Sequence, residues 1–572
     1  MTVIKQRSVS QENVAALQAS GLPPLMSRLF AARGISHVAQ IASNLSGLLP
    51  PQSLTNNQAM AKLLADAIGE NKKFLVIGDY DADGATATAV AVKGLRIFGA
   101  NVSFLVPNRF EYGYGLTPEI VALAATQNPD VIITVDNGIA SVDGVNAANA
   151  LGMQVLITDH HLPGQETPQA ACIINPNQHG CTFASKNLAG VGVMFYALLA
   201  LRAEMRERGV YANTAEPNLT ELLDLVALGT VADLVKLDEN NRILVEQGLR
   251  RIRAGACSQG ITTLLRIAGR EPSKASAQDL GFYVGPRLNA AGRLDDMTLG
   301  IQCLLAGSEV EATVIAQQLH ALNLQRRSIE ADMQDSANIS LDDVQVESQY
   351  SISIYQPDWH QGVIGILASR IKERHHRPVI AFADAGDGLI KGSGRSITGL
   401  HLRDALDLLS KRQPNLIVKF GGHAMAAGLT IRSDDFESFK NGFEAVVRSL
   451  ITEADLESVL EVDGSLSSDE MTFQTAQILE NQVWGQGFAP PLFYDEFEVL
   501  NQRLLGEKHL KLTLKPLSVK AWSTRSGIGA IDAIYFNQTD FLNERIQAIY
   551  QLQTNSYNGA QKVQLNLRYV TP

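Results

Sequence analysis

Four short apolar runs place the strongest constraint on the fold of this chain. They cover residues 74–77, 102–106, 131–135 and 155–157. Apolar residues fill these runs almost continuously, which is typical of strands buried on both faces of a parallel sheet. Segments of helical length separate the runs, at residues 85–98, 118–126 and 141–151. This alternation predicts a doubly wound α/β domain built on one parallel sheet.

Three of the runs end at a cluster of side chains that can bind metal ions. The clusters are Asp79-Tyr80-Asp81-Ala82-Asp83-Gly84, Asp136-Asn137-Gly138 and Asp159-His160-His161. Ligands bind outside the carboxyl ends of the strands in such sheets, so we expect the clusters to lie close together. Their carboxylates would repel one another without a cation, and carboxylates with imidazoles suit Mn²⁺ or Mg²⁺. The clusters therefore predict a divalent-metal site, which points to hydrolysis of phosphoesters.

The first cluster carries three alternating aspartates, Asp79, Asp81 and Asp83. In an extended segment their carboxylates would share one side, as a metal site needs. A solvated acidic turn is the alternative, because Asp and Gly are common in turns. EF-hand loops share this D-x-D-x-D-G pattern, but here Val90 occupies the position of the twelfth-residue ligand and an apolar strand precedes the loop. The pattern therefore disfavours an EF-hand.

The other two clusters also have simpler interpretations, a helix-capping loop aspartate at Asp136 and a surface turn at residues 159–161. A fourth acid is expected from the helix predicted at residues 222–234. Asp224 and Asp233 are nine positions apart, which places them on opposite faces of that helix. We expect Asp233 to face the metals, because it ends the apolar run, and Asp224 to stand at the start of the helix.

The remaining sequence predicts further domains. A mainly helical lead-in is expected before residue 70, and a long helix bridging two domains in the first part of residues 308–355, where Gly and Pro are absent. Alternating polar and apolar residues at 509–515 predict strands of a small β-barrel. Other helices are predicted at residues 188–201, 222–234 and 363–373, and strands at 352–354 and 378–382. Glycine-rich segments predict a functional loop at residues 281–294 and two turns at 392–396 and 421–424.

Composition limits the classes of function. The formal net charge of −11 argues against binding of nucleic acid through a globally basic surface, although a local basic channel remains compatible with it. The four cysteines are far apart and form no CxxC pair, which predicts free thiols in a reducing compartment. Neither a signal peptide nor a run of about 18 apolar residues is present. We therefore expect a cytoplasmic protein without a membrane span.

The three clusters and the segment around Asp233 resemble the four motifs of the DHH phosphoesterases, which are named after the third motif, here residues 159–161. Further matches narrow the resemblance to the RecJ family of single-strand-specific exonucleases. They lie at residues 107–116, 188–193, 285–294 and 359–365 and at the Gly394-Arg395 and Gly422-His423 pairs. One departure is Gly485-Gln486-Gly487-Phe488, where the family often shows a Gly-Asn-Pro turn.

The resemblance implies a fold and an activity for the whole chain. The activity is 5′-to-3′ exonuclease action on single-stranded DNA, which releases 5′-mononucleotides in DNA recombination and repair. The implied domains are a helical lead-in (1–70), a DHH catalytic domain (71–305), a connecting helix (306–345), a smaller α/β DHH-associated substrate-binding domain (346–452) and an OB-like nucleic-acid-binding barrel (453–572).

Two other classes of function remain open. One is a DHH phosphodiesterase acting on oligoribonucleotides, cyclic dinucleotides or pyrophosphate. Such enzymes are generally shorter than this chain and lack the C-terminal domain. The other is a DHH-like scaffold that binds single strands without cutting them, although every acidic motif is intact here.

The resemblance also implies roles at the metal site. Two Mn²⁺ or Mg²⁺ ions would be bridged by Asp136 and would activate a water for attack on phosphorus. Asp159 would orient a histidine, and His161 would stabilise the transition state or donate a proton. The implied metal ligands are Asp79 and Asp81 towards one ion, and Asp83, His160 and Asp233 on the other.

Recognition of the DNA would use residues outside the metal site. By resemblance, Arg395 and His423 come from the second domain and face the metals across a cleft. Candidates for binding the substrate and its 5′-phosphate are Arg109, Arg287, Asn289, Ser393, Arg395 and His423.

The C-terminal region has a local excess of positive charge. From residue 501 onward it holds nine Lys and Arg against four Asp and Glu. We expect its lysines to follow phosphates and Trp522 to stack on bases. The lysines are Lys508, Lys511, Lys515 and Lys520. The expected partners are single-stranded DNA, a single-strand binding protein and a RecQ-type helicase, and the protein is expected to be a monomer.

Overall fold

The computed structural model describes residues 2–108, 111–342, 346–467, 469–517, 529–557 and 560–571. Arg109, Lys520 and Trp522 lie outside these ranges. The chain forms two compact units. The larger unit contains Gln6–His320 and Glu461–Pro572, and the smaller contains the residues up to Lys5 and Ala321–Leu460.

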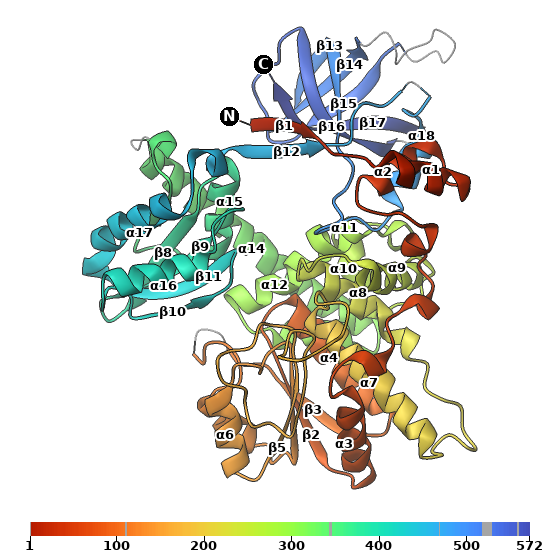
Figure 1. Cartoon of the computed structure of the whole chain (residues 1–572), viewed down its shortest axis with the longest axis vertical. Coiled ribbons are helices and arrows are strands. Elements are labelled where there is room, and N and C mark those ends of the chain that lie inside the picture. The colour runs from red at the N-terminus through yellow and green to blue at the C-terminus, as the bar shows by residue number, and fades with distance from the viewer. Residues whose placement is uncertain are drawn as a thin grey trace. The chain divides into compact units, whose positions relative to one another are not determined.

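The larger unit contains a five-stranded parallel sheet, as the apolar runs predict (Figure 1). Its strand order is β3-β2-β4-β5-β6. The strands are β2 (Lys73–Gly78), β3 (Asn101–Leu105), β4 (Val131–Val135), β5 (Gln154–Thr158) and β6 (Cys172–Ile174). Both faces are covered, so the apolar runs of β2, β4 and β5 are buried, whereas the edge strand β3 is only partly buried.

Helices cover the two faces of this sheet in turn. On one face lie α3 (Asn57–Gly69), α4 (Ala82–Ile97) and α7 (Gly190–Glu207), and on the other α5 (Pro118–Ala125) and α6 (Val142–Ala150) (Figure 1). The chain places β3 on one side of β2 and β4 on the other. The topological switch point therefore lies between β2 and β4, where doubly wound sheets bind ligands.

A group of helices follows the sheet in the sequence. It comprises α8 (Leu223–Ala232), α9 (Glu239–Arg253), α10 (Gln259–Ile267), α11 (Ala277–Asp279), α12 (Gly285–Leu294) and α13 (Thr298–Leu305). The prediction of a loop at residues 281–294 is wrong, because most of it is α12. Pro286 is tolerated in the first turn of that helix, and Gly292 is there because a Cβ would collide with the Tyr80 carbonyl oxygen.

The predicted long helix is α14 (Glu309–Asp342). It begins in the larger unit and continues into the smaller one, so it connects them. Among the residues of the predicted apolar stripe, Leu319 and Met333 are buried.

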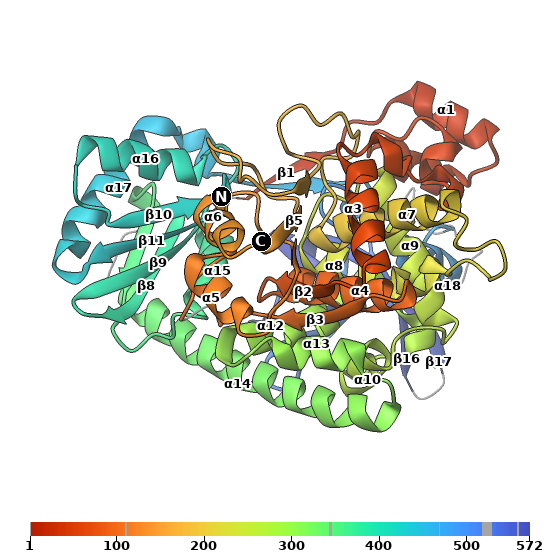
Figure 2. The same cartoon turned by 90° about the horizontal axis from the view of Figure 1, so that it is seen from below.

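The smaller unit contains a second sheet, with the order β10-β11-β9-β8-β7. Its strands are β7 (Ile352–Tyr355), β8 (Val379–Gly386), β9 (Leu389–Arg395), β10 (Lys419–Gly422) and β11 (Ala426–Arg432). Its helices are α15 (Ile364–His375), α16 (Leu402–Arg412) and α17 (Phe436–Leu450). Figure 2 shows α16 and α17 beside these strands, and their apolar side chains share one core with the sheet.

The predicted glycine-rich turn at residues 392–396 is wrong, since Gly392 and Gly394 belong to strand β9. Side chains packed on the sheet explain these glycines. A Cβ on Gly392 would lie 2.6 Å from the Phe382 ring, and one on Gly394 would lie 2.7 Å from Leu402. The second predicted turn follows Gly422, whose φ of 143° ends β10 before the chain returns as β11.

The C-terminal strands form the predicted closed barrel, with the order β13-β14-β15-β17-β16. They are β13 (Phe493–Leu505), β14 (His509–Pro516), β15 (Ile531–Tyr535), β16 (Arg545–Tyr557) and β17 (Ala560–Thr571), with α18 (Phe473–Glu480) before them. Leu510, Leu512 and Leu514 of β14 point into the barrel and are fully or almost fully buried. The intervening residues of β14 face outward, as the alternation predicts.

The N-terminal lead-in is helical in part. It contains α1 (Gln11–Ala19) and α2 (Pro24–Ala31), but it begins with a strand, β1 (Thr2–Gln6), that pairs with β12 (Ser458–Val462). Sequence patterns did not predict this strand, because its partner is more than 450 positions away. Across the described ranges, no helix is both long enough and apolar enough to span a bilayer.

The close contact at Gly292 provides a test of the fold. Gly292→Ala should lower the thermal midpoint in a melting scan, because its Cβ would force α12 away from Tyr80; overpacking of this kind typically destabilises by about 1–3 kcal/mol. Gly307→Ala is the matched control, since the space around Gly307 is open. Equal midpoints for the two variants would contradict this packing.

Candidate metal centre

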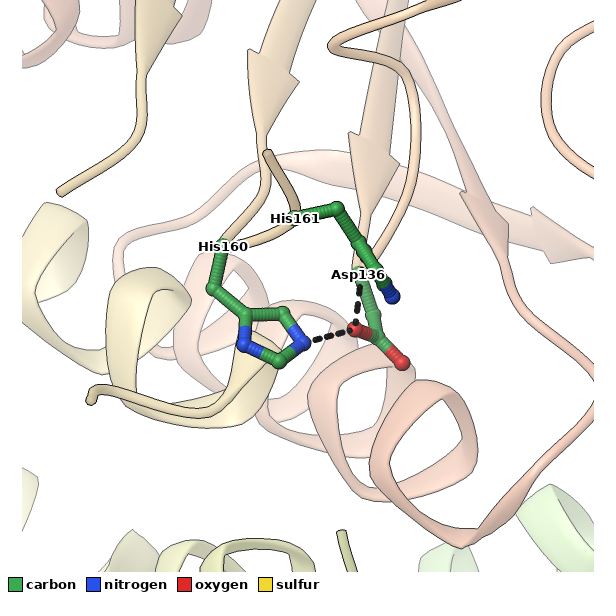
Figure 3. Close-up of side chains that lie close together, drawn as sticks. All are labelled: Asp136, His160 and His161. Atoms are coloured by element: carbon green, nitrogen blue, oxygen red, sulfur yellow. Dashed lines mark ion pairs between the residues drawn. The ribbon is translucent and has the colours of Figure 1, made fainter. Parts of the chain in front are cut away.

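Asp136 lies at the centre of the candidate site, directly after β4. Its carboxylate Oδ1 is 3.0 Å from His160 Nε2 and 4.0 Å from His161 Nδ1 (Figure 3). The backbone of Asp136 is left-handed, with a φ of 62°, and its N–H donates to the Thr158 carbonyl of the neighbouring strand. Because Asp tolerates this conformation, the chain can turn sharply and aim the carboxylate at the two histidines.

The three aspartates of the first cluster do not form the extended segment that their alternation suggests. Helix α4 begins at Ala82, and the Asp81 carboxylate caps it by accepting the N–H groups of Asp83 and Gly84 at 2.9 and 3.0 Å. Asp83 therefore lies in the first helical turn and is almost fully buried. Capping competes successfully with the extended conformation because it satisfies N–H groups that a helix leaves unpaired.

Asp83 is held by the N-terminus of a second helix, α7. Its two carboxylate oxygens accept the N–H groups of Gly190 and Val191 at 2.6 and 3.0 Å. The Oδ2 atom also lies 3.9 Å from His160 Nε2. The positive end of the α7 dipole therefore supports this buried carboxylate.

Both carboxylate oxygens of Asp159 accept hydrogen bonds from nearby groups. Its Oδ1 accepts the N–H groups of His160 and His161 and lies 2.8 Å from His161 Nδ1, and its Oδ2 accepts the Ile139 N–H at 2.9 Å. These contacts fix the orientation of the His161 ring. They leave Asp159 suited to positioning that histidine.

The structure separates the two candidate acids of helix α8. Asp233 follows the end of the helix, and its Oδ2 is 3.5 Å from His160 Nε2. Asp224 lies in the first turn and accepts the Ser258 N–H at 2.7 Å.

The donor atoms cluster closely enough to hold metal ions. Three groups have potential ligand atoms within 4.8 Å of one another: Asp79, Asp81 and Asp136; Asp83, His160 and Asp233; and Asp136, His160 and His161. Asp136 belongs to two of these groups, and His160 links it to the third. Oxygen-rich sets with one or two imidazoles suit Mn²⁺ and Mg²⁺.

The buried carboxylates of the site repel one another, so they need a positive charge between them. Burial, together with the charge of Asp81, raises the pKa of Asp83 to about 7. Burial and the neighbouring aspartates raise the pKa values of Asp136 and Asp233 well above the usual range. Asp136 Oδ1 is buried and accepts no hydrogen bond from the described residues. A cation would both satisfy this oxygen and relieve the repulsion, so the residues present fit divalent metal ions.

For Asp159 and His161, by contrast, the interaction between the two side chains outweighs the effect of burial on their pKa values. Burial alone would raise the pKa of Asp159, but the hydrogen bond and charge of His161 hold it at about 2. Burial would likewise lower the pKa of His161, but Asp159 and the other carboxylates raise it to about 9. His161 is therefore protonated near neutral pH and can place a positive charge or a proton beside Asp136.

Glycines, which have no side chain, allow three helices to approach the metal centre closely. A Cβ on Gly84 would lie 2.5 Å from the Asp79 carbonyl, and one on Gly190 would lie 2.5 Å from Asp136 Cβ. One on Gly229 of α8 would collide with Thr86. These glycines bring the ends of α4, α7 and α8 to the edge of the sheet.

Two of the predicted substrate-binding residues lie on α12. The Asn289 Oδ1 accepts the Ala82 N–H at 2.8 Å, so this residue supports the start of α4. Arg287 is mostly buried, donates to the Tyr283 carbonyl and lies 3.3 Å from His320 Nδ1 through its Nε. A third, Arg109, lies outside the described residues.

Ser393, Arg395 and His423 belong to the smaller unit. Arg395 Nη1 lies 3.2 Å from Ser393 Oγ, and Gly365 in the first turn of α15 packs against both side chains. His423 lies in the turn between β10 and β11, where its N–H donates to the Ala426 carbonyl. A guanidinium, a hydroxyl and a helix N-terminus therefore converge, a combination that suits a phosphate.

Tyr114 is a residue of the site that motif reasoning did not assign. Its hydroxyl lies 3.2 Å from His161 Nδ1 and 3.4 Å from the Asp136 carbonyl, and the residue as a whole is 49% exposed. The flanking Gly113 and Gly115 both have a φ of 77°. A tyrosine between two glycines was the available signal, because such a segment can bend to present one side chain.

Models of three families match the chain. They are "DHH family, N-terminal domain" at residues 73–230, "DHHA1 domain" at residues 347–449 and "RecJ OB domain" at residues 462–569.

Named relatives match along nearly the full length. The chain is 49% identical over 563 residues to the single-stranded-DNA-specific exonuclease RecJ of Dickeya dadantii, covering 96% of each chain. It is 48% identical, with the same coverage, to RecJ of Escherichia coli.

Solved structures share the fold. RecJ from Thermus thermophilus in complex with Mn²⁺ has a TM-score of 0.81 at 28% identity, and the match covers 100% of this chain and 80% of that one. The Mg²⁺ complex of RecJ from the same organism has a TM-score of 0.76 at 27% identity, with 100% and 78% coverage.

Repulsion among the carboxylates predicts how stability depends on pH without metal. The raised pKa of Asp233 means that the folded protein loses stability as pH rises from the usual carboxyl range through that pKa. Asp233→Asn should therefore raise the melting midpoint in EDTA, and by more at pH 8 than at pH 5. We expect a gain of about 2–4 °C at pH 8, the shift that about 1 kcal/mol produces.

The exposed Asp540→Asn serves as the control for this measurement. In Mn²⁺ the order should reverse, with the unsubstituted protein gaining more. A midpoint for Asp233→Asn in EDTA that is unchanged or lower at pH 8 would contradict the repulsion.

Proposed function

Because this chain belongs to the RecJ family of single-stranded-DNA-specific exonucleases, we propose that it removes 5′-mononucleotides from single-stranded DNA in the 5′-to-3′ direction, in recombination and repair. The reaction is metal-dependent hydrolysis of a phosphodiester. The convergence of five aspartates and two histidines at one sheet edge is the observation that carries this proposal.

We assign the ligands of two ions from the proximity of their donor atoms. Asp79 and Asp81 would hold one ion, Asp83, His160 and Asp233 would hold the other, and Asp136 would contribute to both. Mn²⁺ or Mg²⁺ bound there supplies positive charge for the phosphate oxygens and makes a water more acidic.

The histidine pair serves the phosphate in a different way. Asp159 keeps the His161 ring oriented and protonated, through the 2.8 Å contact between Oδ1 and Nδ1. His161 can then stabilise negative charge on the phosphate or donate a proton to the leaving oxygen. The Tyr114 hydroxyl beside this ring limits how far the ring can rotate.

Recognition of the strand end is assigned mainly to the smaller unit. Ser393 and Arg395, with the N-terminus of α15, form a binding site for the 5′-phosphate. His423, from the adjacent hairpin, is a further ligand of that phosphate. In the larger unit, Arg287 and Asn289 belong to the helix that supports the start of α4. Arg109 retains its predicted role in phosphate binding.

The barrel offers a surface for single-stranded DNA. Of the predicted lysines, Lys511 and Lys515 form ion pairs with Asp532 and Glu498, at 3.7 and 3.1 Å. Lys508 and Lys520 remain predicted phosphate contacts, and Trp522 a predicted stacking residue. His509 packs edge-on against the half-exposed Phe536 on the outer face, with ring centroids 5.1 Å apart. This aromatic pair beside cations is a further candidate for stacking bases.

A DHH phosphodiesterase acting on oligoribonucleotides or cyclic dinucleotides is the alternative. The RecJ-type barrel favours the longer substrate, since it adds a surface that a dinucleotide does not need. Digestion of a long end-labelled strand, compared with a dinucleotide, separates the two activities.

The remaining assignments concern organisation and partners. We propose domain boundaries at 71–305, 306–345, 346–452 and 453–572, and the family matches within three of these ranges support them. A monomer, a cytoplasmic location, and partnership with a single-strand binding protein and a RecQ-type helicase complete the proposal. The four unpaired cysteines agree with a reducing compartment.

Removal of the shared carboxylate tests the metal site. Asp136→Ala should reduce the rate of single-strand digestion by about 10³-fold or more, equivalent to about 4 kcal/mol of barrier, because both ions lose a ligand. The release of labelled nucleotides is measured with Mn²⁺ present, and folding is checked by circular dichroism. The exposed Asp143→Ala should digest normally. A folded Asp136→Ala with near-normal activity would refute the assignment.

Recognition of the 5′ end predicts a selective loss. Arg395→Ala should slow digestion of a 5′-phosphorylated strand by about tenfold or more, the value of a charge-assisted contact, while a 5′-hydroxyl strand is affected less. Arg432→Ala, on the adjacent strand β11, is the matched control. Equal losses on both substrates would argue against end recognition by Arg395.

A further inference from the structure

The segment Gly485-Gln486-Gly487-Phe488, which departs from the usual Gly-Asn-Pro sequence of the family, forms a tight turn that the proposed function does not yet use. The Gly485 N–H donates to the Phe488 carbonyl at 3.0 Å, and the Phe488 N–H donates back to the Gly485 carbonyl at 3.1 Å. Gly487 has a φ of 70°, a conformation that glycine adopts without strain. The turn lies between α18 and the first strand of the barrel.

Aromatic stacking holds this turn in place. The rings of Trp484 and Phe488 stack with centroids 5.2 Å apart and an interplanar angle of 18°. The Arg33 guanidinium lies 4.9 Å from the Trp484 ring, and that of Arg242 lies 4.3 Å from the Phe488 ring. Two cations therefore cover the stack, and the attraction between a cation and an aromatic face helps to hold it together. We refer to these four residues and the turn as the aromatic clamp.

The clamp is anchored to two other parts of the larger unit. Arg33, from the end of the α2 region, forms a two-pronged ion pair with Asp463 at 2.9 and 3.0 Å and donates to the Ala489 carbonyl at 2.7 Å. Arg242, from α9, donates to the Leu237 carbonyl at 3.0 Å and to the Gln40 carbonyl at 2.7 Å. The clamp therefore fixes the turn against the segment that precedes α9.

The turn contacts that same segment directly. The Leu237 N–H donates to the Gln486 carbonyl at 2.8 Å. A Cβ on Gly485 would lie 2.6 Å from Leu237 Cδ1, and one on Gly487 would collide with Lys236. The two glycines thus leave room for the Leu237 and Lys236 side chains against the turn, and Gly487 also has a left-handed backbone. Only Leu234 and Val235 lie between this contact, at Lys236 and Leu237, and Asp233, the acid at the end of α8.

Asp233 differs from Asp81, Asp83 and Asp159 in what holds its carboxylate. Asp81, Asp83 and Asp159 each accept main-chain N–H groups. Asp233 accepts no hydrogen bond from the residues that the structure describes, and its nearest recorded partner is His160 Nε2 at 3.5 Å. The next residue, Leu234, has a left-handed backbone, with a φ of 58°, and is 69% exposed as a whole residue. Helix α8 holds the backbone of Asp233 from one side, since the Asp233 N–H donates to the Gly229 carbonyl at 2.9 Å, and the segment that follows holds it from the other.

We propose that the aromatic clamp is the positioning element for the metal ligand Asp233, so that a turn at the base of the barrel sets the geometry of the second ion site. The clamp fixes Lys236 and Leu237, and the short segment that remains gives Asp233 little freedom to move away from Asp83 and Asp136. Without the clamp, repulsion from those carboxylates displaces Asp233. This inference rests on the assignment of Asp233 as a ligand in the proposed function.

Gly485→Ala tests the proposal, because its Cβ meets Leu237 without requiring a left-handed backbone. Binding of Mn²⁺ is measured by titration calorimetry and by the loss of the free-ion paramagnetic resonance signal. We expect one of the two sites to weaken by about tenfold, the effect typical of residues that orient metal ligands. The activity lost at low Mn²⁺ should return at high Mn²⁺.

Gly529→Ala is the control, since it makes the same substitution in the same domain at an open position. If circular dichroism shows that Gly485→Ala does not fold, Arg242→Lys replaces it as the test. That substitution keeps the charge but removes the flat guanidinium over Phe488 and one of its two carbonyl contacts.

The outcomes separate the two hypotheses. Unchanged Mn²⁺ affinity in a folded clamp variant, while Asp233→Asn binds Mn²⁺ weakly, would overturn the positioning role alone. An unsubstituted protein that binds no Mn²⁺, or that does not digest single strands, would instead overturn the proposed function. Weaker binding in the clamp variant than in Gly529→Ala supports the proposal.

Discussion

Repulsion between carboxylates at the edge of the parallel sheet is the constraint on which the rest of this structure depends. Burial and mutual charge raise the pKa values of Asp83, Asp136 and Asp233, so the site is costly to fold without cations. The protein stabilises part of this charge itself, with two main-chain N–H groups at the start of α7 and with the protonated His161. Metal ions supply the remainder. The site is therefore built for ion binding at the expense of local stability.

The surrounding helices are arranged to serve that edge. Glycines at 84, 190, 229 and 292 have backbone or carboxylate atoms where a side chain would be, so α4, α7, α8 and α12 can converge there. The aromatic clamp, whose turn lies just before the barrel in the sequence, also supports the metal centre. It connects the loop after Asp233 to the stack of Trp484 and Phe488 through a main-chain hydrogen bond. Catalytic geometry and domain packing are thus linked within the larger unit.

Much of the fold was predictable because burial leaves a direct trace in the sequence. The apolar runs identified four strands of the parallel sheet, and the absence of Gly and Pro identified the long helix α14. The failures have a common cause. Residues 281–294 and 392–396 were assigned as loops from their glycines, yet those glycines mark close packing inside α12 and β9. A glycine required by a neighbouring element looks the same in a sequence as one required by a turn.

The sequence by itself determined the ligand chemistry, since aspartates and histidines stand where three of the four apolar runs end. Helical periodicity also placed Asp224 and Asp233 on opposite faces of one helix, and the end of the apolar run selected Asp233 as the acid that faces the site. Only the tertiary structure decided how each carboxylate is held. Asp81 caps a helix, Asp83 rests on the N-terminus of α7, and Asp233 depends on a turn about 250 positions away, as the contact between Leu237 and Gln486 records. Such contacts join residues distant in the chain, and their energies arise from packing and desolvation that no local pattern encodes.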